Sequence, residues 1–456
     1  MSTVPSTADW NALQSAIAGE VVLPGSSDYE SARKPPLPRF WDIRPAAVVR
    51  CRTTEDVAEA LAIARRCGID VTARAGGHCF AGRSSTRGLL LDLGPMDAVT
   101  VADGTASVGG GALLGPLYDA VAEHGRTIAG GCGPSVGIAG LTLGGGLGIL
   151  GRRHGLTSDQ LLAAEVVLAD GRTVWCDEQQ HSDLFWALRG AGGLRFGIVT
   201  RLVLETLPAP DATSFELRWP PAAAATLLDA WQRWAPDAPE EIAASLIVTA
   251  AAEPGSPIVA RVFGAMLGSE PDARRMLGEL VTRAGVDPAS ATFVQLPYRE
   301  TKRRLAQHDE GSTAKPDPGH LYAKSQFFRS PLPPHVIAAL IEHLDADRIA
   351  GHARELDFTP WGGAYNRVEA DATAFAHRAE RFLLKHEVVV ASGQADALTP
   401  AARDWLTRSW TLAQPAAAGG AYPNFPDPDL SPWDRAYHGA NLDRLLRVKA
   451  RYADAP

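Results

Sequence analysis

The chain has 456 residues, of which 46% are hydrophobic and 21% are charged, a balance typical of soluble globular proteins of one to three domains. Its formal net charge of −8 at pH 7 argues against a nucleic-acid partner, which would require a basic face. No apolar run approaches the roughly 18 residues of a membrane span, and the N-terminus lacks the basic start and apolar core of a signal peptide, so we expect a cytoplasmic protein.

The first predicted elements form a strand–helix–strand unit. Residues 46–51 predict a buried strand, and Thr53 and Asp56 have the spacing of a capping box at the start of a helix. Gly68 occupies the position expected just after the helix ends. A second strand, 69–73, then leads directly into a glycine-rich loop.

Further elements follow in the first half of the chain. The pattern predicts strands at 89–93 and 99–101, a helix at 115–123, a hairpin of 165–168 and 173–176 around Ala169-Asp170-Gly171, and a strand from 196 to about 207.

Pro208-Ala209-Pro210 interrupts the chain, and the composition beyond it shifts towards alanine, proline and helical patterns. We therefore expect three parts: residues 1–210, a second α+β domain at 211–415, and a C-terminal segment at 416–456. Predicted elements beyond the boundary include strands 242–250 and 382–391 and helices 334–344 and 442–452.

The glycine-rich loop is Arg74-Ala75-Gly76-Gly77-His78, which continues through Gly82 and Ser84-Ser85. Adjacent glycines allow backbone N–H groups to approach an anion closely, and Arg74 adds a positive charge, so a diphosphate fits this arrangement. His78 is unusual there, because phosphate loops normally end in Lys, Ser or Thr. Its imidazole is a candidate for attachment of a cofactor.

A second pattern, Gly146-x-Gly148-x-x-Gly151, matches the dinucleotide fingerprint. The fingerprint requires a long helix after the glycines, followed by a strand that ends in an acidic residue. Here Arg152-Arg153-His154-Gly155 interrupts, and the next strand comes too soon. We therefore interpret these glycines as serving tight packing and phosphate approach, and do not favour an NAD-dependent enzyme.

Several motifs together resemble the berberine-bridge-enzyme-like flavoproteins of the vanillyl-alcohol-oxidase superfamily. The similar segments are Arg74 to His78, Gly137 to Gly146, Gly155-Leu-Thr-Ser-Asp159, Arg189-Gly190, Phe196 to Thr200, Tyr422-x-Asn424, Trp433, Tyr437-His-Gly439 and Arg444 to Lys449. The resemblance covers most of the chain and is weakest between residues 211 and 415. It implies an α+β protein with a PCMH-type FAD-binding domain, a second α+β substrate domain whose antiparallel sheet is covered by helices, and a C-terminal segment that returns to the FAD domain.

The same resemblance implies FAD bound covalently, through His78 to the 8α-methyl group. It implies cofactor contacts from Arg74, Ala75, Gly76, Gly77, His78, Cys79, Gly82, Cys132, Val136, Gly137, Gly140, Leu141, Gly144, Gly145, Gly146, Gly197, Ile198, Asn424 and Tyr437. Many relatives add a bond from a cysteine three residues before the Val-Gly pair. In this chain Gly133 occupies that position and Cys132 lies one residue earlier, so a second bond through Cys132 and a small buried thiol remain alternatives.

The resemblance also implies the catalytic groups. Tyr422 matches the tyrosine of the Tyr-x-Asn motif, which in several relatives acts as the base for the substrate hydroxyl while a hydride leaves for the flavin. We choose His386 as a second catalytic group on strand 382–390, with Glu387 on the opposite strand face and Asp357 as alternatives. Val136 matches an oxygen-gating position and favours an oxidase, whereas His377-Arg378 is interpreted as structural.

The expected function is an oxidase that takes a hydride from an alcohol, a sugar hydroxyl or an activated C–H group and reduces O2 to hydrogen peroxide, in specialised metabolism. Oxidative cyclisation on the same flavin and a non-catalytic flavin-binding protein remain alternatives. The expected partners are a small-molecule substrate and O2. We expect no metal site from the histidine spacing and no disulfide framework from the five cysteines.

Overall fold

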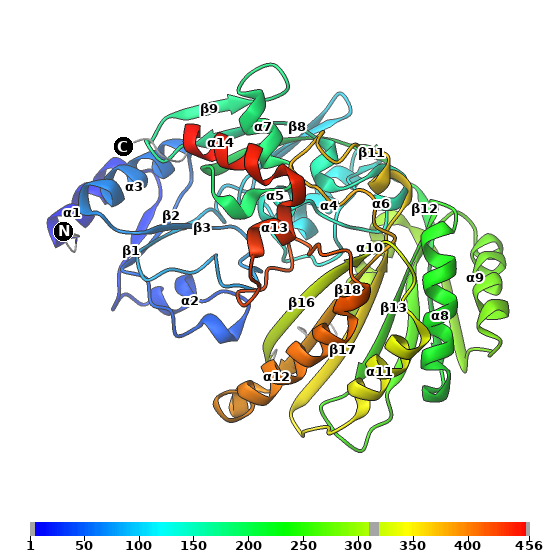
Figure 1. Cartoon of the computed structure of the whole chain (residues 1–456). Helices are drawn as coiled ribbons and strands as arrows, with labels where there is room; N and C mark the ends of the chain where they lie inside the picture. Colours follow the sequence, from blue (N-terminus) through cyan, green and yellow to red (C-terminus); the bar gives the residue numbers. More distant parts are fainter. Residues whose placement is uncertain (1–4, 310–318, 453–456) are drawn as a thin grey trace.

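The computed structural model describes residues 5–309 and 319–452 of the chain. The first part contains a four-stranded sheet of order β1-β2-β4-β3, in which β2, β3 and β4 are parallel, and an antiparallel five-stranded sheet of order β5-β6-β10-β8-β9 (Figure 1). Their strands are β1 (Glu20–Val22), β2 (Ala47–Arg50), β3 (Val71–Arg74), β4 (Leu89–Asp92), β5 (Val99–Ala102), β6 (Thr105–Gly109), β8 (Leu161–Val167), β9 (Thr173–Cys176) and β10 (Ile198–Glu205). Short strands β7 (Arg126–Thr127) and β11 (Leu207–Pro208) form a separate pair.

The strand–helix–strand unit is confirmed as β2, α3 (Thr54–Cys67) and β3. The predicted capping box is present: Thr53 Oγ1 accepts the Asp56 N–H at 3.2 Å, and Asp56 Oδ2 accepts the Thr53 N–H at 3.3 Å. Such a cap stabilises a helix by about 1 kcal/mol. Gly68 ends the helix with a left-handed φ of 63°. Because β3 ends at Arg74, the glycine-rich loop begins at the carboxyl edge of a parallel sheet.

A seven-stranded antiparallel sheet of order β15-β12-β14-β13-β17-β18-β16 forms the second part. Its strands are β12 (Asp211–Trp219), β13 (Ile242–Ala250), β14 (Val259–Leu267), β15 (Ser290–Pro297), β16 (His320–Phe328), β17 (His352–Pro360) and β18 (Phe382–Val390). Figure 1 shows its outer face covered by helices α8 (Ala224–Trp234), α9 (Glu270–Ala284), α11 (Pro334–Asp345) and α12 (Ala395–Ala413).

Alternation along the strands separates the two faces of this sheet. Leu384 and Val388 of β18 belong to the hydrophobic core under the helices, whereas Lys385 and Glu387 line a cavity on the other face. Trp231 of α8 is fully buried in that core, and burial of such a side chain contributes about 2–3 kcal/mol. The seven-stranded sheet therefore has one structural face and one face available for chemistry.

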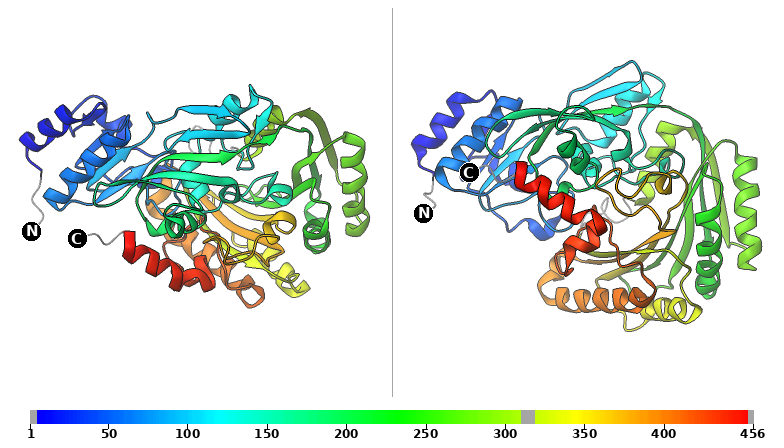
Figure 2. Two further views of the ribbon diagram at one scale, coloured as in Figure 1. Left: turned by 90° about the horizontal axis from the view of Figure 1, so that it is seen from above. Right: turned by 45° about the horizontal axis from the view of Figure 1, so that its top comes forward.

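The C-terminal segment returns to the first part of the chain. Helix α14 (Leu442–Tyr452) lies beside α7 (Ser182–Leu188) in Figures 1 and 2. Its Leu445 and Val448 are buried in the same hydrophobic core as the five-stranded sheet, and the Tyr452 hydroxyl donates to Asp183 at 2.7 Å. The segment before this helix, including Tyr422, is thereby held across both parts.

Seven further α-helices complete the described part of the chain. They are α1 (Thr7–Ala16), α2 (Tyr29–Arg33), α4 (Leu114–Ala122), α5 (Ile138–Leu143), α6 (Gly151–His154), α10 (Tyr298–Asp309) and α13 (Trp433–His438). Within residues 5–309 and 319–452, every helix is too short or too polar to cross a lipid bilayer.

Candidate active site

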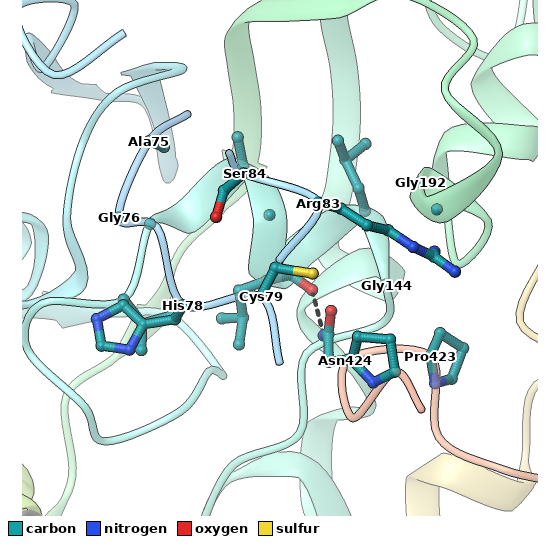
Figure 3. Close-up of a pocket in the computed structure, with 18 of the residues that line it drawn as sticks. Ala75, Gly76, His78, Cys79, Arg83, Ser84, Gly144, Gly192, Pro423 and Asn424 are labelled. Atoms are coloured by element: carbon teal, nitrogen blue, oxygen red, sulfur yellow. Dashed lines mark hydrogen bonds between the residues drawn. The ribbon is translucent and has the colours of Figure 1, made fainter. Parts of the chain in front are cut away.

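A cavity of about 890 Å³ lies between the first part of the chain and the inner face of the seven-stranded sheet. It is within the size range of cofactor sites in proteins. Figure 3 shows part of its lining, where the loop that carries His78 meets the glycine loop of Gly144 and the C-terminal segment of Pro423 and Asn424. Segments far apart in the sequence thus build one site.

Two glycine-rich loops, residues 74–85 (the first glycine loop) and 133–148 (the second glycine loop), pack against each other through their backbones. A Cβ atom on Gly76 would lie 2.4 Å from the Gly137 nitrogen, and one on Gly137 would lie 2.6 Å from the Gly76 nitrogen. Since real Cβ atoms do not approach this closely, both positions require glycine. These glycines therefore bring the two loops together, in addition to the approach to an anion expected from the sequence.

His78 lines the cavity, and its Nε2 lies 3.0 Å from the Ser135 hydroxyl of the second glycine loop. Burial lowers the pKa of His78, although a hydrogen bond with the Ser135 backbone opposes this shift. The imidazole is therefore favoured in its neutral form, which has a nucleophilic nitrogen. Cys79 and Cys132 also line the cavity, and in Figure 3 the Cys79 thiol lies on the side of Asn424 while the His78 ring points the other way.

The structure corrects the role expected for the Arg74 side chain. Its guanidinium donates to the carbonyl oxygens of Arg33, at 2.8 Å, and of Ala32. Arg74 lines the cavity, but its charged group is committed to these two carbonyls. The side chain therefore anchors α2 (Tyr29–Arg33) beneath the loop, and its charge is used there and not on a diphosphate.

Tyr422 is 1% exposed and contributes to the cavity. Its phenolic oxygen accepts the backbone N–H groups of Gly146 and Leu147, both at 3.0 Å, and the Asn424 amide at 3.3 Å. Burial raises the pKa of Tyr422, while these three donors favour the phenolate and oppose the shift. The direction in this structure is upward, which is opposite to the lowered pKa that would suit a tyrosine acting as a base at neutral pH.

The structure also corrects the choice of His386. This residue lies on the helix-covered face of β18, where Nδ1 contacts the Ser409 hydroxyl at 2.8 Å and Nε2 contacts Gln326 Oε1 at 3.1 Å. Burial lowers the pKa of His386 to about 3, so the ring is neutral at physiological pH. Glu387, the alternative on the opposite strand face, lines the cavity together with Asp357. The geometry therefore favours Glu387 as the second catalytic group.

Lys385 is the cavity residue that our sequence reasoning missed most clearly. Its Nζ lies 3.0 Å from Glu387, 3.4 Å from Asp357 and 3.7 Å from Glu355. Burial and the neighbouring carboxylates raise the pKa of Glu355, although Lys385 opposes the shift. The alternation that places Glu387 on the inner face also places Lys385 there, so this signal was available in the sequence. The result is a charged wall opposite the glycine loops.

His386 and Glu387 provide a matched pair for mutation. We expect Glu387→Gln to slow substrate-dependent flavin reduction by at least about tenfold, because it removes an acid–base group from the cavity. We expect His386→Gln to leave that rate within about twofold and to lower the free energy of unfolding by about 1–3 kcal/mol, because it disturbs buried hydrogen bonds. Rapid-mixing spectroscopy and urea denaturation measure the two quantities. The opposite pattern would restore His386 as the catalytic residue.

Most of the expected cofactor-binding residues meet at this cavity. Those that line it are Arg74, Ala75, Gly76, Gly77, His78, Cys79, Cys132, Val136, Gly137, Gly140, Leu141, Gly144, Gly197, Ile198 and Asn424. The expected residues that lie outside the lining are Gly82, Gly145, Gly146 and Tyr437. Gly146 instead packs against Thr157, and the Tyr437 hydroxyl accepts the Asp427 N–H at 2.7 Å. These two residues therefore support the residues of the cavity lining without lining the cavity themselves.

Comparison with known proteins agrees with this geometry. Residues 45–177 match the family model of an FAD binding domain, and residues 421–455 match the model "Berberine and berberine like". The chain is 32% identical to the FAD-linked oxidoreductase YvdP of Bacillus subtilis over 443 residues, which cover 96% of this chain and 95% of the relative. This chain belongs to the berberine-bridge-like FAD-linked oxidoreductases.

Two further relatives of this FAD-linked oxidoreductase extend the comparison. The chitooligosaccharide oxidase of Gibberella zeae is 31% identical over 431 residues, which cover 90% of this chain and 85% of the relative. The solved structure of BBE-like 1 from Physcomitrella patens superposes with a TM-score of 0.86 at 27% identity, covering 97% of this chain and 96% of the other. The PCMH-type architecture expected from the sequence is confirmed.

The residues present fit FAD. Both glycine loops line the cavity and approach each other without Cβ atoms between them, and His78, Cys79 and Cys132 lie in the same lining. The loops are therefore the segments that would hold the diphosphate and the ring system in this FAD-linked oxidoreductase. Within residues 5–309 and 319–452, no cluster of three or more His, Cys, Asp or Glu side chains is arranged to hold a metal ion.

Proposed function

We propose that this protein is an oxidase that removes a hydride from a hydroxyl-bearing small molecule, a sugar or another alcohol, and passes the electrons to O2 to form hydrogen peroxide. The observation that carries the proposal is the meeting of His78, Tyr422 and Glu387, from three distant segments, in one cavity. When bound, FAD supplies a two-electron acceptor that O2 can reoxidise.

We further propose that His78 forms a covalent bond to FAD and that Cys132 forms a second one, each bond replacing one C–H bond of the cofactor with O2 as the two-electron oxidant. The neutral His78 imidazole and its contact with Ser135 support the first bond, since they orient a ring with a free electron pair at the cavity wall. The position of Cys132 in the same lining supports the second. Both bonds would prevent loss of the cofactor.

Tyr422 is the proposed acceptor of the substrate hydroxyl proton. Tyr422 can take that proton only as a phenolate, after its own proton has left for solvent. Burial opposes this ionisation, whereas the three hydrogen-bond donors that converge on the phenolic oxygen favour it. Glu387, held by Lys385 at 3.0 Å, supplies a second acceptor for substrate hydroxyls on the opposite wall. The two walls together would orient an alcohol between them.

The oxidase chemistry and the hydroxyl substrate rest on two supports. Val136 lines the cavity, as expected for a residue that controls access of oxygen. A relative that matches over 90% of this chain is named for the oxidation of a chitooligosaccharide. We propose specialised metabolism as the setting, with a small-molecule substrate bound against the inner face of the seven-stranded sheet.

The attachment of FAD is tested first. We expect acid-precipitated wild-type protein to remain yellow and to carry the added mass of FAD. His78→Ala protein should retain flavin through Cys132, and the His78→Ala/Cys132→Ala double variant should release it. Cys79→Ala, which changes the neighbour of His78, is the matched control and should retain flavin as the wild type does. The intact mass measures the covalently attached FAD, and the visible spectrum measures the flavin that stays with the precipitated protein.

The reaction is tested on the flavin-loaded protein. Anaerobic addition of candidate oligosaccharides and alcohols should bleach the flavin, and air should restore the colour with stoichiometric hydrogen peroxide. A protein that stays colourless and of unmodified mass after FAD supplementation would contradict the proposal of covalent FAD. Yellow protein that no hydroxyl compound bleaches would favour the non-catalytic flavin-binding alternative.

A further inference from the structure

Lys302 of α10 is a buried cation that reaches from the second part of the chain to the loop that carries Cys132. It is 3% exposed, and its ammonium donates to the carbonyl oxygen of Gly130, to that of Gly131 at 2.9 Å and to the Tyr118 hydroxyl at 3.1 Å. All three ammonium protons therefore have acceptors. Two of those acceptors belong to the residues directly before Cys132.

The ammonium lies in a shell of aromatic rings and carbonyl groups. Its Nζ is 4.4 Å from the ring centroid of Tyr118 and 5.6 Å from that of Tyr298. Burial lowers the pKa of Lys302 to about 8, and a negative charge on Cys132 would oppose that shift. A buried cation without an anion is costly, and a nearby thiolate would offset that cost.

Cys132 belongs to the same cluster and also lines the flavin cavity. The Tyr118 hydroxyl donates at 2.7 Å to the carbonyl of Gly131, the residue directly before Cys132. Burial raises the pKa of Tyr118 and Tyr298, and a charge on Cys132 adds to both shifts. The buried Tyr298 hydroxyl has no hydrogen-bond partner within the described part of the chain. The cluster therefore offers one cation and an unused polar hydroxyl next to a single thiol.

We propose that Lys302 is a positioning residue for Cys132, which holds the 130–132 loop at the cavity wall and supplies the positive charge that lets the thiol ionise at neutral pH. The thiol proton passes to solvent, and the thiolate is stabilised by the charge of the ammonium, whose three protons stay on Gly130, Gly131 and Tyr118. A lysine beside a thiol lowers the pKa of the thiol in this way, and the thiolate is the nucleophilic form. The use of this nucleophile on FAD rests on the proposed function, whereas the ionisation of Cys132 does not.

The pH dependence of Cys132 modification tests this role. Purified wild-type, Lys302→Met, Lys302→Arg and Cys132→Ser proteins are treated with iodoacetamide between pH 5.5 and 9, and peptide masses give the alkylated and flavin-bound fractions. At pH 7 we expect Cys132 of the wild type to react about tenfold faster than that of Lys302→Met, which corresponds to one pKa unit. Lys302→Arg keeps the charge and should keep most of the reactivity. Cys79, on the same cavity, is the internal control and should not respond to Lys302.

The peptide map also separates this inference from the proposed function. If flavin occupies Cys132 in the wild type, Lys302→Met should keep flavin on His78 while its flavin-bound fraction at Cys132 falls about tenfold. Protein without any covalent flavin would contradict the proposed attachment, and its alkylation profile would still test Lys302. An unchanged profile or flavin-bound fraction in Lys302→Met would overturn the inference. If that variant does not fold, a wild-type alkylation midpoint at or above about pH 8.5, the ordinary cysteine value, would overturn it.

Discussion

Tyr422→Phe is expected to lower kcat/KM by about 10²–10⁴-fold, the usual contribution of a positioned general base. The variant keeps the aromatic ring, which packs at 5.0 Å from Phe425 and 6.2 Å from Phe375, and removes the hydroxyl. Anaerobic flavin reduction by substrate measures the loss. Flavin content should stay at the wild-type level, because Tyr422 does not carry the cofactor in our proposal.

Tyr365→Phe is the matched control for this experiment. The Tyr365 hydroxyl also bonds to the second glycine loop, where it donates to the Gly148 carbonyl at 3.1 Å and accepts the Gly148 N–H at 3.2 Å. Both variants therefore lose hydrogen bonds to the same loop, at a cost of about 1–3 kcal/mol for the groups left unpaired. Equal losses of activity in the two variants would show that Tyr422 supports the loop and is not the base.

Arg378→Met is expected to lower the free energy of unfolding by about 3–5 kcal/mol, because it leaves a buried carboxylate without its cation. Arg378 donates to the two carboxylate oxygens of Asp159 at 2.8 and 2.6 Å, and their side chains are 3% and 10% exposed. The pair joins the segment after β17 to the turn that precedes β8 in the FAD-binding part. Urea denaturation followed by tryptophan fluorescence measures the change.

Arg403→Met gives the contrasting result. Arg403 also contacts both oxygens of a carboxylate, that of Asp429, at 2.7 Å each, but the two side chains are about half exposed. Exposed pairs of this kind contribute about 0–1 kcal/mol, since solvent screens the charges. Similar destabilisation by both variants would mean that burial does not set the strength of the Arg378–Asp159 pair.

The local signals in the sequence predicted the elements that carry the FAD loops. The capping box of Thr53 and Asp56, the terminating Gly68 and the hairpin around Asp170-Gly171 depend on residues that are close together in the chain, and all are present in the structure. The motifs around His78 and Tyr422 also led to residues that line one cavity. These signals succeed because helix caps, turns and loop motifs are decided by local backbone conformation.

The choice between neighbouring residues on one strand could not be made in the same way. A strand alternates its side chains between two faces, but the sequence did not show which face of β18 the helices cover. The structure places His386 under α12, beside Ser409, and Glu387 on the inner face. Arg74 is a similar case, because its acceptors in residues 32 and 33 lie far from it in sequence.

By itself, the sequence determined the family, the FAD loops and the segments that supply the candidate catalytic groups, since these depend on local motifs and on their order along the chain. Only the tertiary structure decided which side chains share the cavity. Tyr422 against Gly146 and Lys302 beneath Cys132 lie where they do because packing of the later parts of the chain against the FAD-binding part brings distant segments together. Such contacts depend on which face of each element is buried, and that is settled only when the elements pack.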